Sequence, residues 1–502
     1  MISDVFSYAS VVPDFEITFS HLVSDYESIQ SKSGSKSDTE GYKKTLEELS
    51  IKPYFTFSPT SDDFSGKNIQ SYTFSTSTDD ITGSFSITVK EDTKSLKSSK
   101  TYFLDQVEEL DLVTIKEGGT VEFYGIVRTI SFGATAGAFN KAITISGTSA
   151  AGLLNMYKIS TDLTITNFFN GTSNNISIAD QLARAFLKSD TGAVNVEEIF
   201  RIIYNDFVEV GKMNSNIAST KIQRLFRFIF GVSHETEGQG VEFLDCDLKS
   251  DMQLVANLYG QSECNVISYF KGLMPENIYE IFYFQQRKDT KYKKYNKPGK
   301  PLIKIREMPF SAEDWKNLNK IEIRPVRLTD YTLTKTDTNI FTAFYAWAEG
   351  SPANAEFYKK IGAEEKGNKV MNIDDELVQL YGYIPLEVSF IGYKDKTKDK
   401  DESIMKNKSS QIADWYRNLK DMWNGDITLV NLWQSEKNPR IGERIGFCGG
   451  EFYVKTCTHT WQYGNGGKIN LAIERGGIYK GGKFQAGEKL SLSKTFAELL
   501  EK

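Results

Sequence analysis

The chain has 502 residues, 40% of them hydrophobic and 25% charged, so about three domains with buried cores are expected and global disorder is excluded. The formal net charge of −6 opposes a protein that mainly grips nucleic acid, because that work needs a basic face. Four cysteines and three histidines are too few for a disulfide framework or an ordinary zinc site.

The N-terminal residues lack the basic and apolar segments of a secretion signal, and no stretch is apolar for long enough to span a membrane. We therefore expect the protein to fold in the cytoplasm, with no membrane span, and to leave it only within a larger assembly.

The first 155 residues are predicted to form strands. In the segment 84–89, Phe85, Ile87 and Val89 share one face while serine and threonine share the other, a period of two residues. Similar signals place strands at 17–19, 71–77, 113–115, 121–130 and 141–146, with a turn at 117–119 and a solvated loop at 31–38. The pattern favours an antiparallel barrel or sandwich.

Helices are predicted next. Ser177 and Asp180 form a capping box, Asn195 is placed to cap a second helix, and a third helix over 217–230 stops at Gly231. The sequence thus predicts a helical insertion from 177 to 231.

Strands return after this insertion. Two of them, 277–284 and 301–306, flank a lysine-rich loop at 288–300, which is either a phosphate-binding patch or, as we favour, a solvated hairpin tip. Two strands over 321–347 joined across 336–339, a charged loop at 393–402, a helix at 409–423 and a tail helix at 493–502 follow the same reasoning. The last strands are expected at 426–432, 444–447, 451–461 and 468–474.

The predicted fold class is mainly β with α insertions (α+β), built on two tube-type antiparallel β-barrel domains. The expected units are a first barrel (1–155), a helical insertion (156–235), a mixed linker with the basic hairpin (236–318), a second barrel with an inserted helix (319–486) and a C-terminal tail (487–502). Two β-rich halves in one chain hint at a duplicated architecture.

The histidines are few enough to test one by one for catalysis. His21 lies near a strand end and His234 in a loop, while His459 shares a strand face with Cys457, two residues away. No Gly-x-Ser-x-Gly elbow occurs, so a packing role for Cys457 and His459 is favoured over a catalytic pair.

Other candidate motifs carry little chemistry. Adjacent acidic residues at 62–63, 79–80, 108–109 and 374–375 are expected by chance among 66 carboxylates, and the glycines at 464–467 and 476–482 precede no helix that could bind phosphate. Cys246, Cys264 and Cys448 are expected to be reduced and packed. We predict no catalytic, cofactor-binding or metal-binding residue, no cofactor, and no enzymatic activity.

Three stretches, in this order, resemble the hub proteins of phage tails and contractile injection machines. Residues 79–89 resemble the long hairpin of a first tube domain. Residues 277–315, with Arg306-Glu-Met-Pro-Phe310, resemble the strand and loop that precede a second one. Residues 438–475, with His459-Thr-Trp461 before a glycine turn and Arg475 at the end, resemble its closing strands.

The resemblance implies a structural protein. Such hubs are trimers in which each subunit contributes two similar barrels to a pseudo-sixfold ring, joining the tail tube ring to a central spike or tip and contacting other baseplate proteins. It implies a lumen through which DNA or effectors pass transiently, and a place in the virion tail or an equivalent particle, assembled in the host cytoplasm. The alternatives are a tail-associated peptidoglycan hydrolase and a receptor-binding tail-tip protein.

Overall fold

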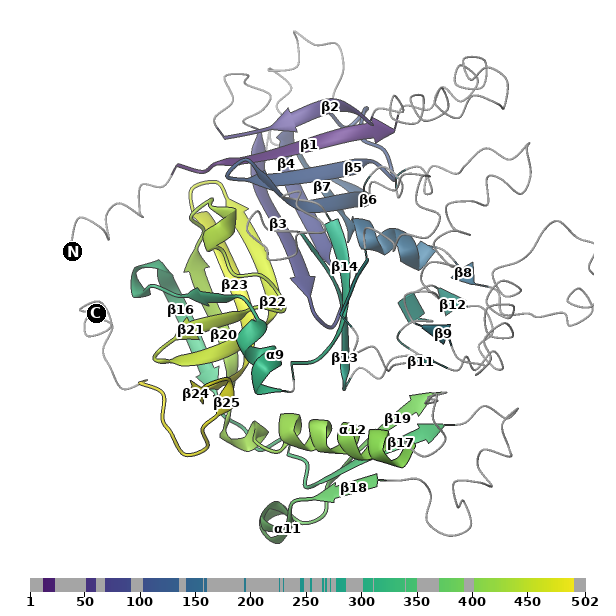
Figure 1. Ribbon diagram of the computed structural model, residues 1–502. Helices are drawn as coiled ribbons and strands as arrows, with labels where there is room; N and C mark the ends of the chain where they lie inside the picture. The colour runs from purple at the N-terminus through teal and green to yellow at the C-terminus, as the bar shows by residue number, and fades with distance from the viewer. Residues whose placement is uncertain are drawn as a thin grey trace, which may run out of the picture.

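The computed structural model describes residues 12–22, 51–59, 68–91, 103–134, 141–156, 158–159, 277–285, 301–309, 311–338, 340–349, 370–391 and 401–491, with isolated short segments between 194 and 271 (Figure 1). The predicted loops at 31–38 and 288–300, the tail helix, His234 and most of the helical insertion lie outside the described residues. Within that insertion, Leu225 and Ile229 are helical as predicted.

A single 13-stranded sheet organises the molecule, in the order β16-β20-β23-β22-β3-β4-β7-β6-β5-β1-β2, with β21 beside β22 and β15 beside β21 (Figure 1). Its N-terminal strands are β1 (Phe15–Leu22), β2 (Ile51–Phe57), β3 (Ile69–Ser77), β4 (Ser84–Glu91), β5 (Leu112–Glu117), β6 (Thr120–Ala134) and β7 (Lys141–Ser149). Its C-terminal strands are β15 (Lys320–Glu322), β16 (Leu328–Thr334), β20 (Trp423–Val430), β21 (Arg444–Phe447), β22 (Gly450–Gln462) and β23 (Gly466–Gly477). We call these two sets the first half and the second half.

The two halves repeat one strand order. In the first half the four long strands β3, β4, β6 and β7 lie in the order β3-β4-β7-β6, and in the second half β16, β20, β22 and β23 lie in the corresponding order β16-β20-β23-β22. In each half a short strand precedes a long one and pairs with it in a tight antiparallel hairpin, β5 with β6 and β21 with β22. The hint of duplication in the sequence therefore has a counterpart in the sheet.

The period-two pattern explains which face of the sheet is buried. Along β4, Phe85, Ile87 and Val89 are buried, as predicted, while the residues between them are exposed or half-buried. The buried side chains of the first half form one apolar cluster with the linker strands described below, and those of the second half form another. Because both clusters lie against one continuous sheet, the halves share a backbone framework.

Smaller elements pack around this sheet. The linker sheet has the order β10-β14-β13 and consists of β10 (Leu244–Asp247), β13 (Tyr279–Gln285) and β14 (Pro301–Glu307). The side sheet has the order β18-β17-β19 and consists of β17 (Ala343–Glu349), β18 (Val370–Ile373) and β19 (Pro385–Ile391). The α-helices whose bounds lie within the described residues are α9 (Ala312–Asn317), α11 (Asp375–Tyr381) and α12 (Asp401–Tyr416), and one of the 3-10 helices spans Ala150–Met156. Three two-stranded pairs complete the description: β8 (Lys158–Ile159) with β12 (Cys264–Asn265), β9 (Val194–Asn195) with β11 (Gln253–Leu254), and β24 (Tyr479–Lys480) with β25 (Lys483–Phe484).

Several elements differ from the sequence expectation. The helix expected at 409–423 begins earlier, at Asp401, and ends at Tyr416, because Trp423 already starts β20. The two strands expected on either side of the 336–339 connection are present, but they belong to different sheets, since β16 pairs with β20 in the main sheet and β17 belongs to the side sheet. Helix α11 was not predicted at all. Asp374, interpreted as half of a chance acidic pair, caps it by accepting a hydrogen bond from the backbone of Leu377.

The β-rich fold class with helical parts is confirmed. The described strands form no closed barrel, since the main sheet runs as one path from β16 to β2. In the part of the chain that the structure describes, no helix is long and apolar enough to cross a membrane.

Candidate functional site

The two halves meet where β3 pairs with β22. The pairing is antiparallel and unbroken from Ser77 opposite Thr456 to Ser71 opposite Gln462. Two hydroxyl contacts add to the ladder, Ser75 Oγ to Thr458 Oγ1 at 2.8 Å and Thr456 Oγ1 to Ser77 Oγ at 3.3 Å. We call these paired strands, with the side chains buried beneath them, the junction.

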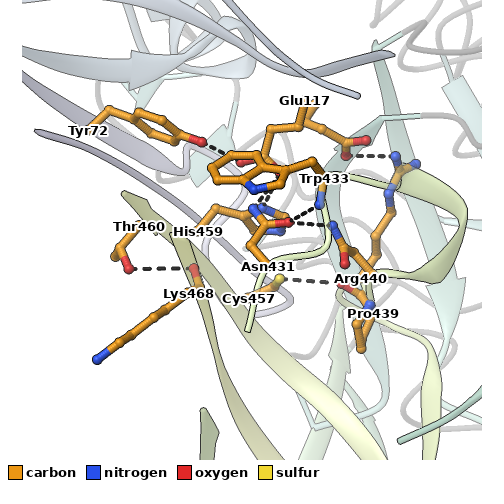
Figure 2. Close-up of polar contacts among 12 residues, drawn as sticks. Tyr72, Glu117, Asn431, Trp433, Pro439, Arg440, Cys457, His459, Thr460 and Lys468 are labelled. Carbon is orange, nitrogen blue, oxygen red and sulfur yellow. Dashed lines mark hydrogen bonds and ion pairs between the residues drawn. The ribbon is translucent and has the colours of Figure 1, made fainter. Parts of the chain in front are cut away.

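A buried ion pair lies beneath the junction (Figure 2). His459 on β22 places Nδ1 2.9 Å from Oε2 of Glu117, which ends β5 in the other half. Tyr72 on β3 donates its hydroxyl to Oε1 of Glu117 at 2.7 Å, and Asn431 donates its side-chain amide to Oε2 at 2.9 Å. One carboxylate thus gathers donors from both halves and from both junction strands.

The electrostatics of this cluster favour charged partners. Burial alone raises the pKa of Glu117, but the attraction of His459 and the hydrogen bonds from His459, Asn431 and Tyr72 bring it below its ordinary value. Burial alone lowers the pKa of His459, yet Glu117 raises it well above the ordinary value. Burial and Glu117 also raise the pKa of Tyr72, which stays a neutral donor.

Hydrogen bonds of the side-chain amides of Asn431 and Asn438 extend the cluster further into the second half (Figure 2). The side-chain oxygen of Asn431 accepts from the backbone N–H of Trp433 at 2.9 Å and from the side chain of Asn438 at 3.1 Å. Arg327, just before β16, donates to Asn438 at 2.8 Å and to the carbonyl of Lys437 at 2.6 Å. The chain from β5 to the start of β16 is therefore connected by buried polar contacts, which fix one relative placement of these segments.

A second buried pair ties in the linker sheet. Arg440 places Nη2 2.7 Å from Oε2 of Glu122 on β6 and also donates to the carbonyl of Gln285 on β13. A small cavity lies beside the two ion pairs, and its lining includes His459, Cys457 and Tyr283. The junction is thus a three-way contact between the first half, the second half and the linker sheet.

Cys457 and His459 do lie on one face of β22, as the spacing predicts. The thiol of Cys457 donates to the carbonyl of Pro439 at 3.4 Å, and each of the two residues is 3% exposed. With His459 held by Glu117 and neither side chain reachable from solvent, the geometry fits packing, not nucleophilic attack on a polymer such as peptidoglycan.

The other residues that carried the family resemblance are also buried contacts. Arg306 on β14 donates to Glu280 at 2.9 Å, to the carbonyl of Gly442 at 2.9 Å and to the hydroxyl of Tyr453 at 2.7 Å. Trp315 on α9 stacks on Tyr479 with ring centroids 4.3 Å apart. These contacts attach the linker sheet and α9 to the second half.

Arg475 attaches the side sheet region in a similar way. Its guanidinium lies 3.5 Å from the ring centroid of Trp415 at the end of α12, and Nη1 donates to the Trp415 carbonyl at 2.6 Å. Its backbone has φ of +59°, a conformation that is uncommon for a residue other than glycine.

His21 lies in a separate cluster at the far end of β1. Its Nδ1 is 2.9 Å from Oδ1 of Asp111, whose Oδ2 accepts from the hydroxyl of Tyr54 at 3.0 Å and from the backbone N–H of Glu108 at 2.9 Å. Glu108 brings a third ligand-type atom close enough for a metal to be considered. Both oxygens of Asp111 already have protein donors, so hydrogen bonding explains the cluster, which ties β1 to the residue just before β5.

Sequence reasoning missed the main members of the junction. The sequence places Glu117 in a turn at 117–119, and Tyr72 and Asn431 are not singled out. The sequence nevertheless contains a signal for Glu117. Ile115 faces the core, and Glu117, two residues further along the strand, lies on the same face. The partner could not be found, because His459 lies 342 positions away.

No family model and no curated protein matches the chain. Among solved structures it is similar to the tail protein from Neisseria meningitidis MC58, with 9% identity, a TM-score of 0.46, and coverage of 81% of this chain and 92% of that one. It is also similar to the 43 kDa tail protein of prophage MuSo2 from Shewanella oneidensis, with 10% identity, a TM-score of 0.41, and coverage of 83% and 96%. A third is an Escherichia coli protein described as a component of the type VI secretion system, with 6% identity, a TM-score of 0.33, and coverage of 84% and 76%. At these scores the likeness does not define the fold of this chain.

Proposed function

We propose that the chain is a structural hub subunit of a phage tail or contractile injection machine. Three copies form a pseudo-sixfold ring that joins the tail tube to a central spike or tip and surrounds a channel. The observation that carries the proposal is the repeated strand order of the two halves, together with the way in which β22 of one meets β3 of the other. The number of copies in the ring, three, is taken from the motif resemblance to tail hub proteins.

The repeat specifies how copies would join. Counted in chain order among the four repeated strands of each half, the third strand of the second half (β22) pairs within the chain with the first strand of the first half (β3). The corresponding contact between copies pairs the third of the four repeated strands of the first half (β6) with the first of those of the second half (β16). One edge of β6 pairs with β5 only from Thr120 to Ile126, so β5 does not cover the rest of that edge. β16 is the last strand at one end of the sheet.

The character of β16 fits this role. Its outward residues, Thr329, Asp330, Thr332 and Thr334, are exposed, yet Asp330 is the only charge in the strand. An edge strand with few charges and no proline is open to pairing with another strand, so in this proposal a second copy satisfies it.

Light scattering of the purified chain over a range of concentrations tests the ring. We expect a mass three times that of the 502-residue chain. A single-chain mass at every concentration would contradict a ring that forms without further partners.

Two proline variants test the edge. Thr332→Pro and Leu333→Pro remove backbone N–H groups that point to opposite edges of β16, because consecutive residues alternate. One variant should lose pairing with β20 and therefore stability. The other should keep the melting temperature of a monomer yet fail to trimerise. If both variants trimerise normally, β16 is not the contact edge.

A further inference from the structure

Exposed apolar side chains cluster around α11. Eight large apolar side chains of the described residues are exposed, and five of them fall between positions 373 and 384. Leu380 and Tyr381 end the helix, Tyr383 and Ile384 follow it, and Ile373 on β18 precedes it. We call these five residues the α11 patch. Clustered apolar side chains on a surface mark a place where another protein segment binds.

The side sheet holds the α11 patch in one conformation. Thr342, just before β17, donates its hydroxyl to the carbonyl of Gly382 at 2.9 Å and accepts from the backbone N–H of Ile384 at 2.8 Å. Gly382, with φ of +80°, ends the helix, and Asp374 at its start lies 2.9 Å from Nε of Arg417. A surface that is already ordered loses little conformational entropy when a partner binds, so binding to this patch is favoured.

The charges beside the α11 patch are acidic. Residues 370–391 contain four carboxylates and neither lysine nor arginine. Asp375 and Glu376, in the first turn of α11, and Glu387 on β19 are exposed. A segment that covers this surface therefore needs apolar or aromatic side chains for the patch itself and lysine or arginine for its surroundings.

The chain itself contains a segment of that composition, the lysine-rich loop at 288–300 between β13 and β14. The loop carries six lysines and two tyrosines against one aspartate. Tyrosine is enriched in protein interfaces, and the lysines supply the charge that residues 370–391 lack. We infer that the α11 patch is the docking site for the lysine-rich loop of a second copy of this chain. The inference rests on the proposed association of copies and adds to it a contact that does not involve β16.

The loop of the same chain does not reach the patch. Helix α12 contacts the open end of the β13–β14 hairpin, where Tyr416 donates to the carbonyl of Asn277 at 3.2 Å and Lys408 pairs with Glu307 at 2.6 Å. The loop leaves the other end, after Gln285, about 20 Å away along β13. Figure 1 shows α11 on the side of α12 away from β13, which adds a helix width of about 10 Å. The middle of the loop extends only about 25 Å from its base when fully stretched.

Zero-length coupling of lysines to carboxylates tests the contact in the full-length chain. After reaction with a carbodiimide, denaturing electrophoresis separates single chains from joined chains, and peptide mapping locates the new bonds. We expect bonds between the loop at 288–300 and Asp375 or Glu376 in the bands of joined chains. The same bonds confined to the single-chain band would mean that loop and patch belong to one chain, which overturns docking on a second copy.

Light scattering of the same samples separates this contact from the ring. A three-chain mass without these bonds overturns the docking and leaves the ring standing. The bonds in a particle of two chains keep the docking and overturn the ring. A single-chain mass at every concentration overturns both.

Two matched pairs of variants test the patch. Leu380→Ser removes its most exposed side chain, and Val12→Ser is the control, because these residues are 69% and 67% exposed. Glu376→Lys reverses a charge at the second residue of α11, and Glu313→Lys does the same at the second residue of α9. Each patch variant should raise the concentration at which copies associate about tenfold. The controls should leave it unchanged.

Thermal melting checks that all four variants fold. The loop variant Lys293→Ser/Lys294→Ser leaves the patch intact and should weaken association in the same way. Combined with Glu376→Lys, it should weaken association by less than the two effects added together, because both remove one contact. Patch variants that associate like their controls, or fully additive effects, overturn the docking.

Discussion

Glu117 and His459 bring opposite charges together where neither meets water. Such a pair gains little over an apolar contact when intact, because both charges lose their hydration. Its removal from one side only is expensive, because the remaining charge is left buried without a partner. The pair therefore acts mainly to specify which strands meet at the junction.

Glu117→Ala should lower the free energy of unfolding by about 3–5 kcal/mol, since it leaves His459, Tyr72 and Asn431 without their shared acceptor. Urea denaturation measures the loss. The control is Glu16→Ala, which breaks the exposed pair with Lys116 and should cost less than about 1 kcal/mol. Equal losses of unfolding free energy in the two variants would mean that the buried junction pair contributes no more to stability than the exposed pair.

The pair also predicts a pH dependence with a defined sign. The lowered pKa of Glu117 stabilises the fold above the ordinary glutamate value, and this contribution is lost as pH falls through the folded value. The raised pKa of His459 contributes fully below the ordinary histidine value and is lost as pH rises through the folded one. Both contributions are complete between about pH 4.3 and 6.5.

Stability measured by urea midpoints should therefore fall as pH rises from about 6.5 toward 9, by up to about 1.4 kcal/mol per pH unit for His459. In Glu117→Gln the partner that raises the pKa of His459 is gone, so this decline should largely disappear. Identical curves for the two proteins would show that His459 is not protonated in the folded state.

At the scale of single residues, the sequence predicts faces better than partners. The shared strand face of Cys457 and His459 follows from a spacing of two, and so do the buried Phe85 and Ile87. What the spacing cannot supply is the residue on the other side of the contact. Arg306 was noticed as part of a motif, but its hydrogen bonds to Glu280 and Tyr453 depend on segments far apart in sequence.

Among elements, the hairpin between β5 and β6 shows how a turn takes part in the contact between halves. Gly118 and Gly119 both have positive φ, of 56° and 74°. A Cβ on Gly118 would lie 1.9 Å from the backbone oxygen of Trp433 in the second half, whereas a Cβ on Gly119 would meet nothing within 4 Å. The turn is thus seated against the other half at one of its two glycines.

The two glycines form a matched pair for mutation. Gly119→Ala should cost about 1–2 kcal/mol, the strain of a left-handed alanine. Gly118→Ala carries the same strain and must also push the turn away from Trp433, so its melting temperature should be clearly lower than that of Gly119→Ala. Equal melting temperatures would argue against close packing of the turn on Trp433.

Strands were predicted from the sequence more reliably than helices. The alternating runs in both halves correspond to β3 to β7 and β20 to β23, because one buried face imposes a period of two. The start of α12 was missed because the charged residues before it resemble a loop, and α11 was missed because it is short. The order of the strands in the sheet could not be predicted from the sequence, since β3 pairs with β22, which lies most of the chain length away in sequence.

In the whole molecule, the continuous sheet makes the two halves mechanically dependent. The predicted division into barrels at 1–155 and 319–486 stays a prediction, but hydrogen exchange can test whether the halves open separately. In Glu117→Ala, backbone amides of β4 and β7 should lose protection together with those of β20 and β23. Loss confined to one half would indicate two independently stable domains.

The junction within each chain also affects how a ring would assemble. A contact between parts of one chain forms at an effective concentration that is high and independent of how much protein the cell contains. In a ring of three chains, half of the contacts between halves would thus be complete as soon as each chain folds, and dilution would act only on the other half. A ring of six separate subunits would need every contact to form by collision. Two halves joined in one polypeptide would thus lower the order of the assembly reaction, because three bodies would have to meet where six separate subunits would otherwise have to.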